Sequence, residues 1–205
     1  MTEQRQLAAA SDCISLRRSL SASAVNDPPS GMSDCVYKGI VMGKKILVVS
    51  DNHGSWENLQ VALDYTKGQI DALVHCGDSE FTPEMLRGMA DCPVYLAEGN
   101  CDYYFSGDRE DIFELDGHVC FVTHGNQYGV NWGEDELLDK ALEMGADIVF
   151  YGHTHVPAYH VYEDEGVTIF NPGSIAQPRQ MPPVPSFLVV ELKEDGEVEP
   201  HFYKL

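Results

Sequence analysis

Residues 46–54 read ILVVSDNHG, an apolar run that ends in Asp51 and His53. Short β-branched runs bounded by glycine are typical of buried strands. Four further segments repeat this design, and each leads from an apolar run into Asp, Asn or His: 72–78 (ALVHCGD), 94–102 (VYLAEGNCD), 119–125 (VCFVTHG) and 147–155 (DIVFYGHTH). We therefore expect these polar residues at the carboxyl ends of strands, the edge at which open α/β sheets bind ligands.

The net charge of −20 lies entirely in residues 44–205. Residues 1–43 carry four acidic and four basic residues, whereas the following 162 residues carry 29 acidic and nine basic ones. A domain of this size buries about 70% of its unfolded surface, which is enough for a stable hydrophobic core without disulfides or structural metal ions. Because nucleic-acid affinity rests on Lys and Arg that neutralise phosphates, so acidic a domain argues against a long nucleic acid as partner.

Residues 1–43 are interpreted as a disordered N-terminal extension of a single domain, 44–205. A transit peptide is the less favoured alternative, because it rests only on the Arg and Ser content. No apolar stretch approaches the roughly 18 residues that a membrane span requires. The six cysteines are irregularly spaced. We therefore expect a cytoplasmic protein without a membrane partner or a disulfide framework.

The predicted elements place helices early and strands late. Helical periodicity covers 56–66, 83–89 and about 134–143. Asp116-Gly117 predicts a tight hairpin turn, and the last strands are expected near 158–162, 167–170, 186–192 and 198–203. This order favours an α/β fold in which two mixed sheets pack on each other with helices outside, a four-layer α-β-β-α sandwich.

The polar residues at the strand ends form a set of candidate metal ligands, two Asp, one Asn and four His: Asp51, His53, Asp78, Asn100, His124, His153 and His155. Oxygen and imidazole donors suit Mn²⁺, Fe²⁺, Zn²⁺, Ni²⁺ or Co²⁺. Seven ligands are too many for one tetrahedral ion, so we expect two divalent ions about 3.5–4 Å apart, with Asp78 as the candidate bridge. His75 lies inside an apolar run and is interpreted as a hydrogen-bonded core histidine.

In their order along the chain, the motifs Asp-x-His, Gly-Asp, Gly-Asn, His-Gly and Gly-His-Thr-His resemble the calcineurin-like metallophosphoesterases. The resemblance covers nearly all of residues 44–205. It is strongest to the small single-domain phosphodiesterases of bacteria and archaea, to which a retromer subunit is also related. Asn171-Pro172-Gly173-Ser174 matches a further segment of these small enzymes.

The resemblance implies Mn²⁺ as the usual ion, and a catalytic role for Asn100 and His124 besides metal binding. It also implies two metal sites. Asp51, His53 and His155 would hold one ion, Asn100, His124 and His153 would hold the other, and Asp78 would bridge the two ions.

Cys101 stands where many members of the superfamily have a histidine that assists the leaving group, so the general acid is unassigned. We expect two nearby cations to favour a thiolate, which has no proton to donate.

Asp102 either orients a neighbour or caps a turn, and Arg179 either binds a substrate phosphate or pairs with a surface carboxylate. Cys101, Asp102 and Arg179 are the candidate substrate contacts. Five aromatic residues either form a wall that contacts an aryl group or nucleobase of the substrate, or are ordinary core or rim residues. They are Trp56, Tyr103, Tyr104, Phe105 and Trp132.

These features predict a dinuclear metal-dependent phosphodiesterase that hydrolyses a small phosphodiester by attack of a metal-bridging hydroxide. The alternative is a non-catalytic protein-interaction scaffold on the same fold, but a scaffold tends to lose ligands and all seven positions are filled here. A nuclease on polymeric DNA is less favoured, since neither basic grooves nor a capping domain is evident. The sequence leaves the physiological substrate and the oligomeric state open.

Overall fold

The computed structural model describes residues 43–103 and 107–205 of the 205-residue chain. The predicted disordered extension, apart from Gly43, lies outside the described residues, and so do Tyr104 and Phe105. The domain boundary at residue 44 therefore stays a prediction. The described residues form ten strands, three α-helices and one 3-10 helix.

The first sheet is mixed and has the strand order β10-β9-β1-β2-β3. Strands β1, β2 and β3 run parallel, with Val49 opposite His75, whereas β9 and β10 are antiparallel to their neighbours. This register aligns the ends of the parallel strands, so the following loops, which carry Asp51, Asp78 and Asn100, leave the same edge of the sheet. The strands are β1 (Lys44–Val49), β2 (Ala72–His75), β3 (Val94–Leu96), β9 (Ser186–Leu192) and β10 (Val198–Lys204).

The second sheet is also mixed and has the order β4-β5-β6-β8-β7. Its central strands β5, β6 and β8 run parallel, and His124 and His153 follow the first two of them. The predicted hairpin joins β4 to β5, where Asp116 and Gly117 both have positive φ, 53° and 86°, as a tight primed turn requires. The strands are β4 (Glu110–Leu115), β5 (His118–Thr123), β6 (Ile148–Phe150), β7 (Pro157–Tyr162) and β8 (Val167–Pro172).

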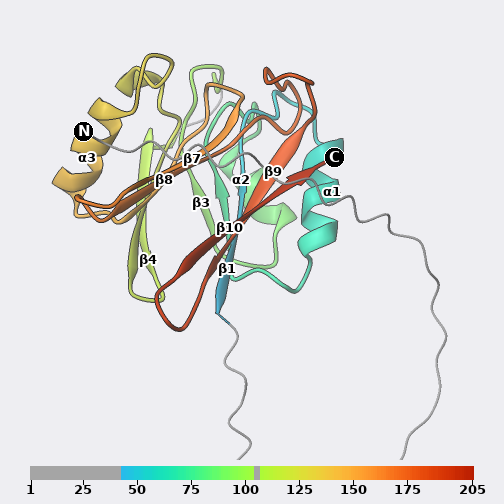
Figure 1. The fold of residues 1–205 in the computed structure, drawn as a ribbon. Helices are drawn as coiled ribbons and strands as arrows, with labels where there is room; N and C mark the ends of the chain where they lie inside the picture. The colour runs from blue at the N-terminus through green and yellow to red at the C-terminus, as the bar shows by residue number, and fades with distance from the viewer. Residues whose placement is uncertain (1–42, 104–106) are drawn as a thin grey trace, which may run out of the picture. The chain divides into compact units, whose positions relative to one another are not determined.

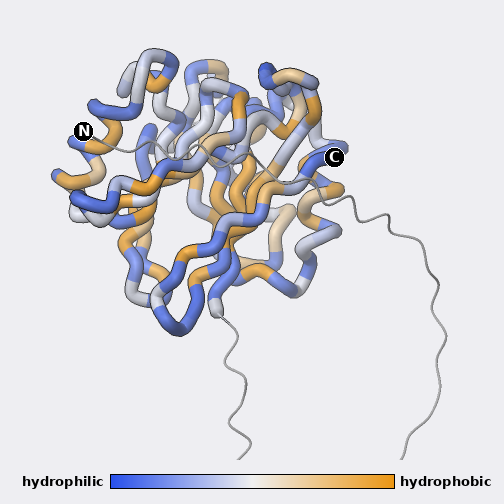
Figure 2. Tube along the Cα trace, viewed as in Figure 1, coloured by the Kyte–Doolittle hydropathy of each residue, from blue (hydrophilic) through white to orange (hydrophobic). Residues whose placement is uncertain are grey.

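The two sheets face each other across one apolar layer. Val48 and Val74 of the first sheet belong to the same buried cluster as Val122 and Phe150 of the second. Figure 2 shows this pattern as hydrophobic residues along the strands, while the tip of the β9–β10 hairpin is hydrophilic. Alternation of side chains along each strand leaves a second apolar face on the outside of each sheet.

Helices cover both outer faces. Helices α1 (Glu57–Thr66) and α2 (Pro83–Met89) pack on the first sheet, through side chains that include Leu59 and Leu86. Helix α3 (Asp135–Met144) packs on the second sheet through Leu137 and Ala141. Figure 1 shows α3 on one side and α1 on the other, with the sheets between them. The predicted four-layer α-β-β-α sandwich is therefore confirmed.

One element was not predicted, the 3-10 helix η1 (Asn126–Tyr128) directly after β5. Gly125 and Gly129 flank it with φ of 93° and 60°, so it is a single turn between two left-handed residues. A segment this short carries no periodicity from which it can be recognised. Among the described residues, no helix has the length and apolar character needed to cross a membrane.

Candidate metal centre

The loops after the strands turn back sharply. Five of the seven candidate ligands have positive φ, 55° at Asp51, 43° at His53, 52° at Asp78, 65° at His153 and 60° at His155. Left-handed backbone is uncommon for residues with a Cβ, and surrounding contacts must stabilise it. Neighbouring loops provide such contacts, because the N–H of Asp51 donates to Gly77 O at 3.1 Å and the N–H of His53 to Asp78 O at 3.0 Å.

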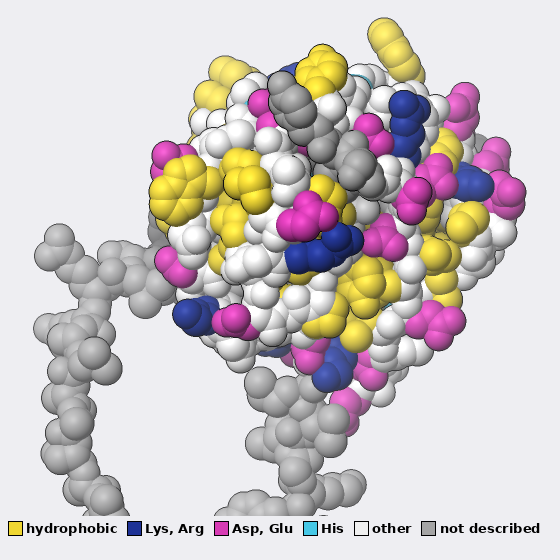
Figure 3. Space-filling view, turned by 180° about the vertical axis from the view of Figure 1, so that it is seen from behind, with side chains coloured by type: hydrophobic (Ala, Val, Ile, Leu, Met, Phe, Trp, Pro, Cys, Tyr) yellow, Lys and Arg dark blue, Asp and Glu magenta, His cyan; other side chains and the backbone are white. Residues whose placement is uncertain are grey.

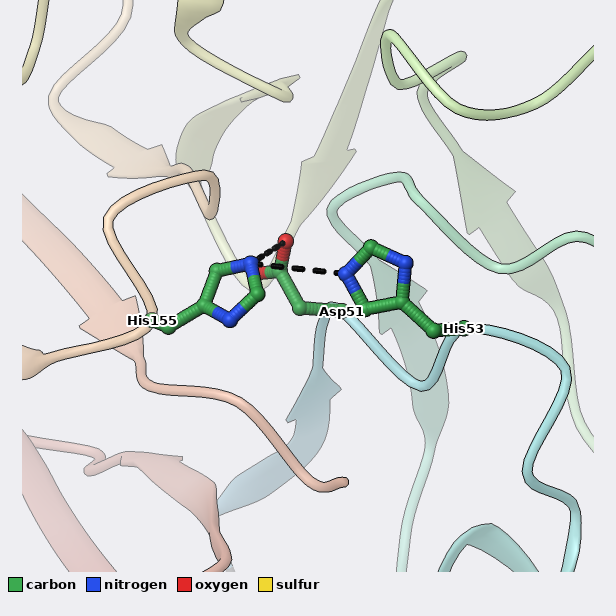
Figure 4. Close-up of side chains that lie close together, drawn as sticks. All are labelled: Asp51, His53 and His155. Carbon is green, nitrogen blue, oxygen red and sulfur yellow. Dashed lines mark hydrogen bonds and ion pairs between the residues drawn. The ribbon is translucent and has the colours of Figure 1, made fainter. Parts of the chain in front are cut away.

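Asp51, His53 and His155 form the first cluster (Figure 4). The Nε2 atom of His155 lies 3.1 Å from Asp51 Oδ1 and 3.4 Å from His53 Nε2. The other ring nitrogen of His155 lies 2.6 Å from the carbonyl oxygen of Gln177 and must donate a proton to it. In the neutral ring Nε2 is then an unprotonated acceptor, so three acceptor atoms face one another. Such an arrangement calls for a cation.

Asp51 is fully buried at the end of β1. Its Oδ2 accepts from Ser50 Oγ at 2.6 Å and from the N–H of His153 at 3.1 Å, whereas Oδ1 has no hydrogen-bond partner among the described residues. Burial raises the pKa of Asp51, but contacts with His155, His124 and Ser50 outweigh it and the net shift is downward. An ionised, buried oxygen whose nearest polar neighbour is a histidine ring nitrogen, at 3.1 Å, fits a metal ligand.

His124 and His153 form a second pair. His124 is buried, and its Nδ1 donates to Cys76 O at 2.7 Å, which leaves Nε2 facing His153 Nδ1 at 3.2 Å. The remaining nitrogen of His153, Nε2, lies 2.9 Å from the side-chain amide of Asn131. Asn131 was not among the predicted site residues, and its surrounding sequence has no pattern from which it could have been found.

Asn100 is exposed in the turn after β3. Among the described residues, its amide hydrogen-bonds only Cys101 Sγ, at 3.2 Å. The turn brings Asn100 to the same sheet edge as the other candidates, but not into hydrogen-bond contact with His124 or His153. Its predicted role as a ligand of the second ion thus remains a prediction.

Asp78 lies between the two groups of histidines. Its Oδ2 is 3.4 Å from His124 Nε2 and 3.9 Å from His53 Nε2, and its Oδ1 accepts the N–H of Cys101 at 2.7 Å. Burial raises the pKa of Asp78, but His124 and the Cys101 N–H lower it by more, and the pKa lies far below its usual range. One oxygen of an ionised carboxylate is therefore near one histidine of each predicted metal site.

Two glycines allow the loops to approach this closely. A Cβ at Gly99 would lie 2.2 Å from Asp78 N, and a Cβ at Gly152 would lie 2.0 Å from Ser50 Oγ. These distances are far below van der Waals contact. The Gly of Gly-Asn and the Gly of Gly-His-Thr-His are thus required by close approach between ligand loops.

The Asn171–Ser174 segment at the end of β8 supports two ligand loops. Asn171 Nδ2 donates to Gly152 O at 2.8 Å, and Ser174 Oγ donates to Asp51 O at 2.7 Å. Both side chains are buried. They hold the backbone on which Asp51 and the histidines after Gly152 are placed.

Glu80 and Asp102 connect the ligand loops in a way that the sequence did not reveal. Glu80 Oε1 lies 3.1 Å from His53 Nδ1. Asp102 is buried, and its carboxylate accepts from the N–H of Glu80 at 2.6 Å, from Ser79 Oγ at 3.2 Å and from the N–H of Gly99 at 2.8 Å. Asp102 therefore joins the loop after β2 to the turn after β3, and both alternatives considered for it, orienting a neighbour and capping a turn, describe part of this role.

Cys101 lies close to Asp78 and His53, with one donor atom of each within 4.8 Å of the others. Burial and the Asp78 carboxylate raise the pKa of the Cys101 thiol to about 11. The charges of the protein itself therefore favour a neutral thiol, and the expected thiolate depends on the cations alone. Neither form is a good proton donor near neutral pH.

Arg179 contacts the Gly-His-Thr-His turn. Its Nη1 donates to His153 O at 3.3 Å and its N–H to His155 O at 3.1 Å. Within the described part of the chain it has no ion pair, so the salt-bridge alternative finds no partner there. Of the predicted aromatic wall, Tyr103 lines a cavity beside Asn100, and Trp56 and Trp132 are exposed.

His75 is a core histidine, as predicted. It is buried, its Nε2 lies 2.8 Å from Asn52 Oδ1, and its Nδ1 accepts the N–H of Gly77 at 3.2 Å. Burial lowers its pKa to about 4, so the ring is neutral at pH 7. Its bond to Asn52 supports the loop on which Asp51 and His53 lie.

Carboxylates and histidines gathered at one sheet edge are typical of metal-dependent hydrolases. The family described as "Calcineurin-like phosphoesterase superfamily domain" matches residues 45–195. The probable metallophosphoesterase YsnB of Bacillus subtilis (strain 168) is 34% identical over 153 residues, which cover 74% of this chain and 86% of the relative. The phosphodiesterase MJ0936 of Methanocaldococcus jannaschii is 27% identical over 172 residues, which cover 75% of this chain and 98% of that protein. The chain belongs to the calcineurin-like phosphoesterase superfamily.

Solved structures agree with this assignment. A conserved uncharacterised protein of Streptococcus pneumoniae TIGR4, a predicted phosphoesterase, aligns with a TM-score of 0.66 at 29% identity and covers 79% of this chain and 98% of its own. Vps29 of Entamoeba histolytica in complex with Zn²⁺ aligns with a TM-score of 0.60 at 25% identity, over 78% and 98% of the two chains. The resemblance to this family that the motifs indicated is confirmed.

Proposed function

We propose that the chain is a dinuclear metal-dependent phosphodiesterase that acts on a small phosphodiester. The observation that carries this proposal is the position of Asp78 Oδ2, within 4 Å of His124 Nε2 and of His53 Nε2. An ionised oxygen between two histidine groups suits a bridge between two cations. The family supports a metallophosphoesterase, and the relative MJ0936, named a phosphodiesterase, supports the diester class.

In this proposal Asp51, His53 and His155 hold one ion and Asn100, His124 and His153 hold the other. Asp51 Oδ1, which is buried and lacks a hydrogen-bond partner among the described residues, supports the first site. His124 and His155 each donate Nδ1–H to a backbone carbonyl, which fixes the tautomer and turns Nε2 inward as a ligand. The oxygen and imidazole donors agree with the proposed Mn²⁺, and with Zn²⁺, Fe²⁺, Ni²⁺ or Co²⁺.

Two divalent ions at such a centre supply the nucleophile for phosphodiester hydrolysis and neutralise charge on the phosphate oxygens. The residues of the chain have separate tasks. The backbone carbonyls of Cys76 and Gln177 hold the buried histidines in one orientation, so that little reorganisation is needed on substrate binding. Glu80 orients His53, and Asp102 holds the Glu80 backbone.

A small substrate is favoured by the charge of the domain. Figure 3 shows acidic side chains spread over the face that it draws, with basic side chains scattered among them. A surface of this kind repels a polyphosphate chain.

The four cysteines of the described residues, Cys76, Cys92, Cys101 and Cys120, are free, which supports the proposed cytoplasmic location.

The alternative is a non-catalytic protein-interaction scaffold, and the structural similarity to Vps29 is the observation that supports it. A filled ligand set favours the enzyme. The experiment that separates the two is turnover of bis(4-nitrophenyl) phosphate with added Mn²⁺, beside a chelator-treated sample and Asp78→Asn. Metal-dependent release of 4-nitrophenol that is lost in Asp78→Asn supports the enzyme, and its absence in the wild type supports the scaffold.

A further inference from the structure

A cavity of about 280 Å³ opens beside Asn100. Its wall comes from three segments, the turn after β3, the residue before β4 and the first residue of η1. Among the described residues, Asn100 is the one candidate metal ligand on this wall, so the cavity extends to one side of the proposed centre. The other lining residues are Glu98, Gly99, Asp102, Tyr103, Arg109 and Asn126.

Contacts of the neighbouring residues fix the backbone at Arg109 and Asn126, which both line this wall. The carboxylate of Glu110 accepts from the hydroxyl of Tyr128 and from Gln127 Nε2, the latter at 3.3 Å. These bonds tie η1 to the first residue of β4. Because Arg109 directly precedes Glu110 and Asn126 directly precedes Gln127, the same contacts fix the backbone from which these two lining side chains extend.

Arg109 has no ion-pair partner among the described residues, although acidic residues outnumber basic ones by 29 to nine in residues 44–205. Glu98 lines the same cavity, yet its carboxylate is not within 4 Å of a guanidinium nitrogen of Arg109. The other carboxylate on the wall, Asp102, is already engaged by the N–H groups of Gly99 and Glu80. The cavity is therefore lined by one cation that forms no ion pair among the described residues, and the planar guanidinium with its parallel N–H donors matches a carboxylate or a phosphate.

We propose that this cavity binds a second anionic group, a carboxylate or a phosphate, carried on one ester arm of the substrate. Arg109 is the principal donor, Asn126 adds an amide donor, and Tyr103 covers the arm. This inference rests on the proposed function, because the phosphorus of the same substrate is taken to lie at the metal centre. It narrows the substrate from small phosphodiesters in general to those with an acidic arm.

The test compares two series of phosphonates on the full-length chain loaded with Mn²⁺. One series carries a terminal carboxylate on alkyl chains of graded length, and the other consists of the plain alkyl phosphonates of equal length. Dissociation constants are measured by titration calorimetry. In the wild type the carboxylate should tighten binding about 10- to 100-fold at the best chain length, as a charge-assisted bond does. Arg109→Gln should abolish this advantage, and Arg109→Lys should keep part of it, because Lys is a point charge without the fork.

Arg87→Gln is the matched control, since Arg87 is exposed in the last turn of α2 and does not line the cavity. It should show the wild-type ratio of dissociation constants. Equal binding of both series by the wild type, no binding of either, or an undiminished advantage in Arg109→Gln would overturn the inference. Failure of the proposed function is read separately, as absence of diester turnover by the same wild-type sample.

Discussion

Replacement of Asp78 by Asn removes one charge from the oxygen that the two proposed metal sites share. The change should spare the fold, because Asn tolerates the φ of 52° at this position. The Asn side-chain carbonyl can also still accept the N–H of Cys101, as Asp78 Oδ1 does at 2.7 Å. Any effect is then expected in metal binding rather than in stability.

The size of the effect follows from the position of Oδ2 between His124 and His53. Two divalent ions about 4 Å apart repel each other by roughly 16 kcal/mol at an effective dielectric constant of about 20, and a shared carboxylate offsets part of this repulsion. Loss of a group that only orients a ligand costs about 10- to 100-fold in affinity. Loss of a shared ligand should therefore cost more than about 100-fold for both ions, or about 3 kcal/mol each. His155→Ala removes a ligand of one proposed site only and should spare the other ion.

The assay is a Mn²⁺ titration by calorimetry, with turnover of bis(4-nitrophenyl) phosphate on the same samples. The melting temperature of the chelator-treated variant serves as the folding control and should match that of the wild type. If Asp78→Asn bound two ions with wild-type affinity and kept normal turnover, the bridging role of Asp78 would be refuted.

Three further predictions concern the groups around the ligands. Glu80→Gln should lower the affinity for the ion bound by His53 about 10-fold, because a neutral amide orients His53 Nδ1 less strongly than a carboxylate does. The control Glu84→Gln, on the exposed side of α2, should leave the Mn²⁺ titration unchanged. Alkyl diesters should lag behind aryl diesters, because Cys101 is a poor proton donor both as a thiol, whose pKa is about 11 without bound cations, and as a thiolate beside two cations. Cys101→His should narrow the gap by up to the typical 10²- to 10⁴-fold of a placed acid. A selective loss of alkyl turnover in Cys101→Ala would instead identify Cys101 as the acid. His75 has a folded pKa lowered from 6.5 to about 4, so the unfolded chain binds more protons across this window. The free energy of unfolding of chelator-treated protein should therefore fall by up to about 3 kcal/mol from pH 6.5 to 4, and a flat profile in urea unfolding would contradict this.

The fold could be predicted because its signals are local. The expected helix at 83–89 is found as Pro83–Met89, where Pro83 occupies the first turn and Thr82 caps the N–H of Met85. The strands were recognised because buried runs of four to seven residues are mostly apolar, as in β2 and β9. The order of strands, such as β8 between β6 and β7, depends on tertiary packing and has no local signal. The single turn η1 was missed because it is shorter than one helical period.

The candidate ligands could be found because each follows a strand by one to five residues, as Asp51 follows β1 and His124 follows β5. Their supporting residues could not. Glu80 reaches His53 only because the loop bends at positive φ. Arg109 and Asn126 line the same cavity because Glu110 contacts η1, and the sequence has no local signal for this contact. Arg179 was considered either as a phosphate ligand or as a surface salt-bridge partner, and the sequence did not reveal that its guanidinium donates to the His153 carbonyl.

The central claim is that two metal ions occupy this site and that both are needed for hydrolysis. The most direct measurement is the number of Mn²⁺ ions bound per chain, recorded together with turnover of bis(4-nitrophenyl) phosphate as the ions are added to chelator-treated protein. We predict two ions per chain, with most of the turnover gained as the second ion binds. Saturation at a single ion with full turnover, or two bound ions without any turnover, would contradict the account.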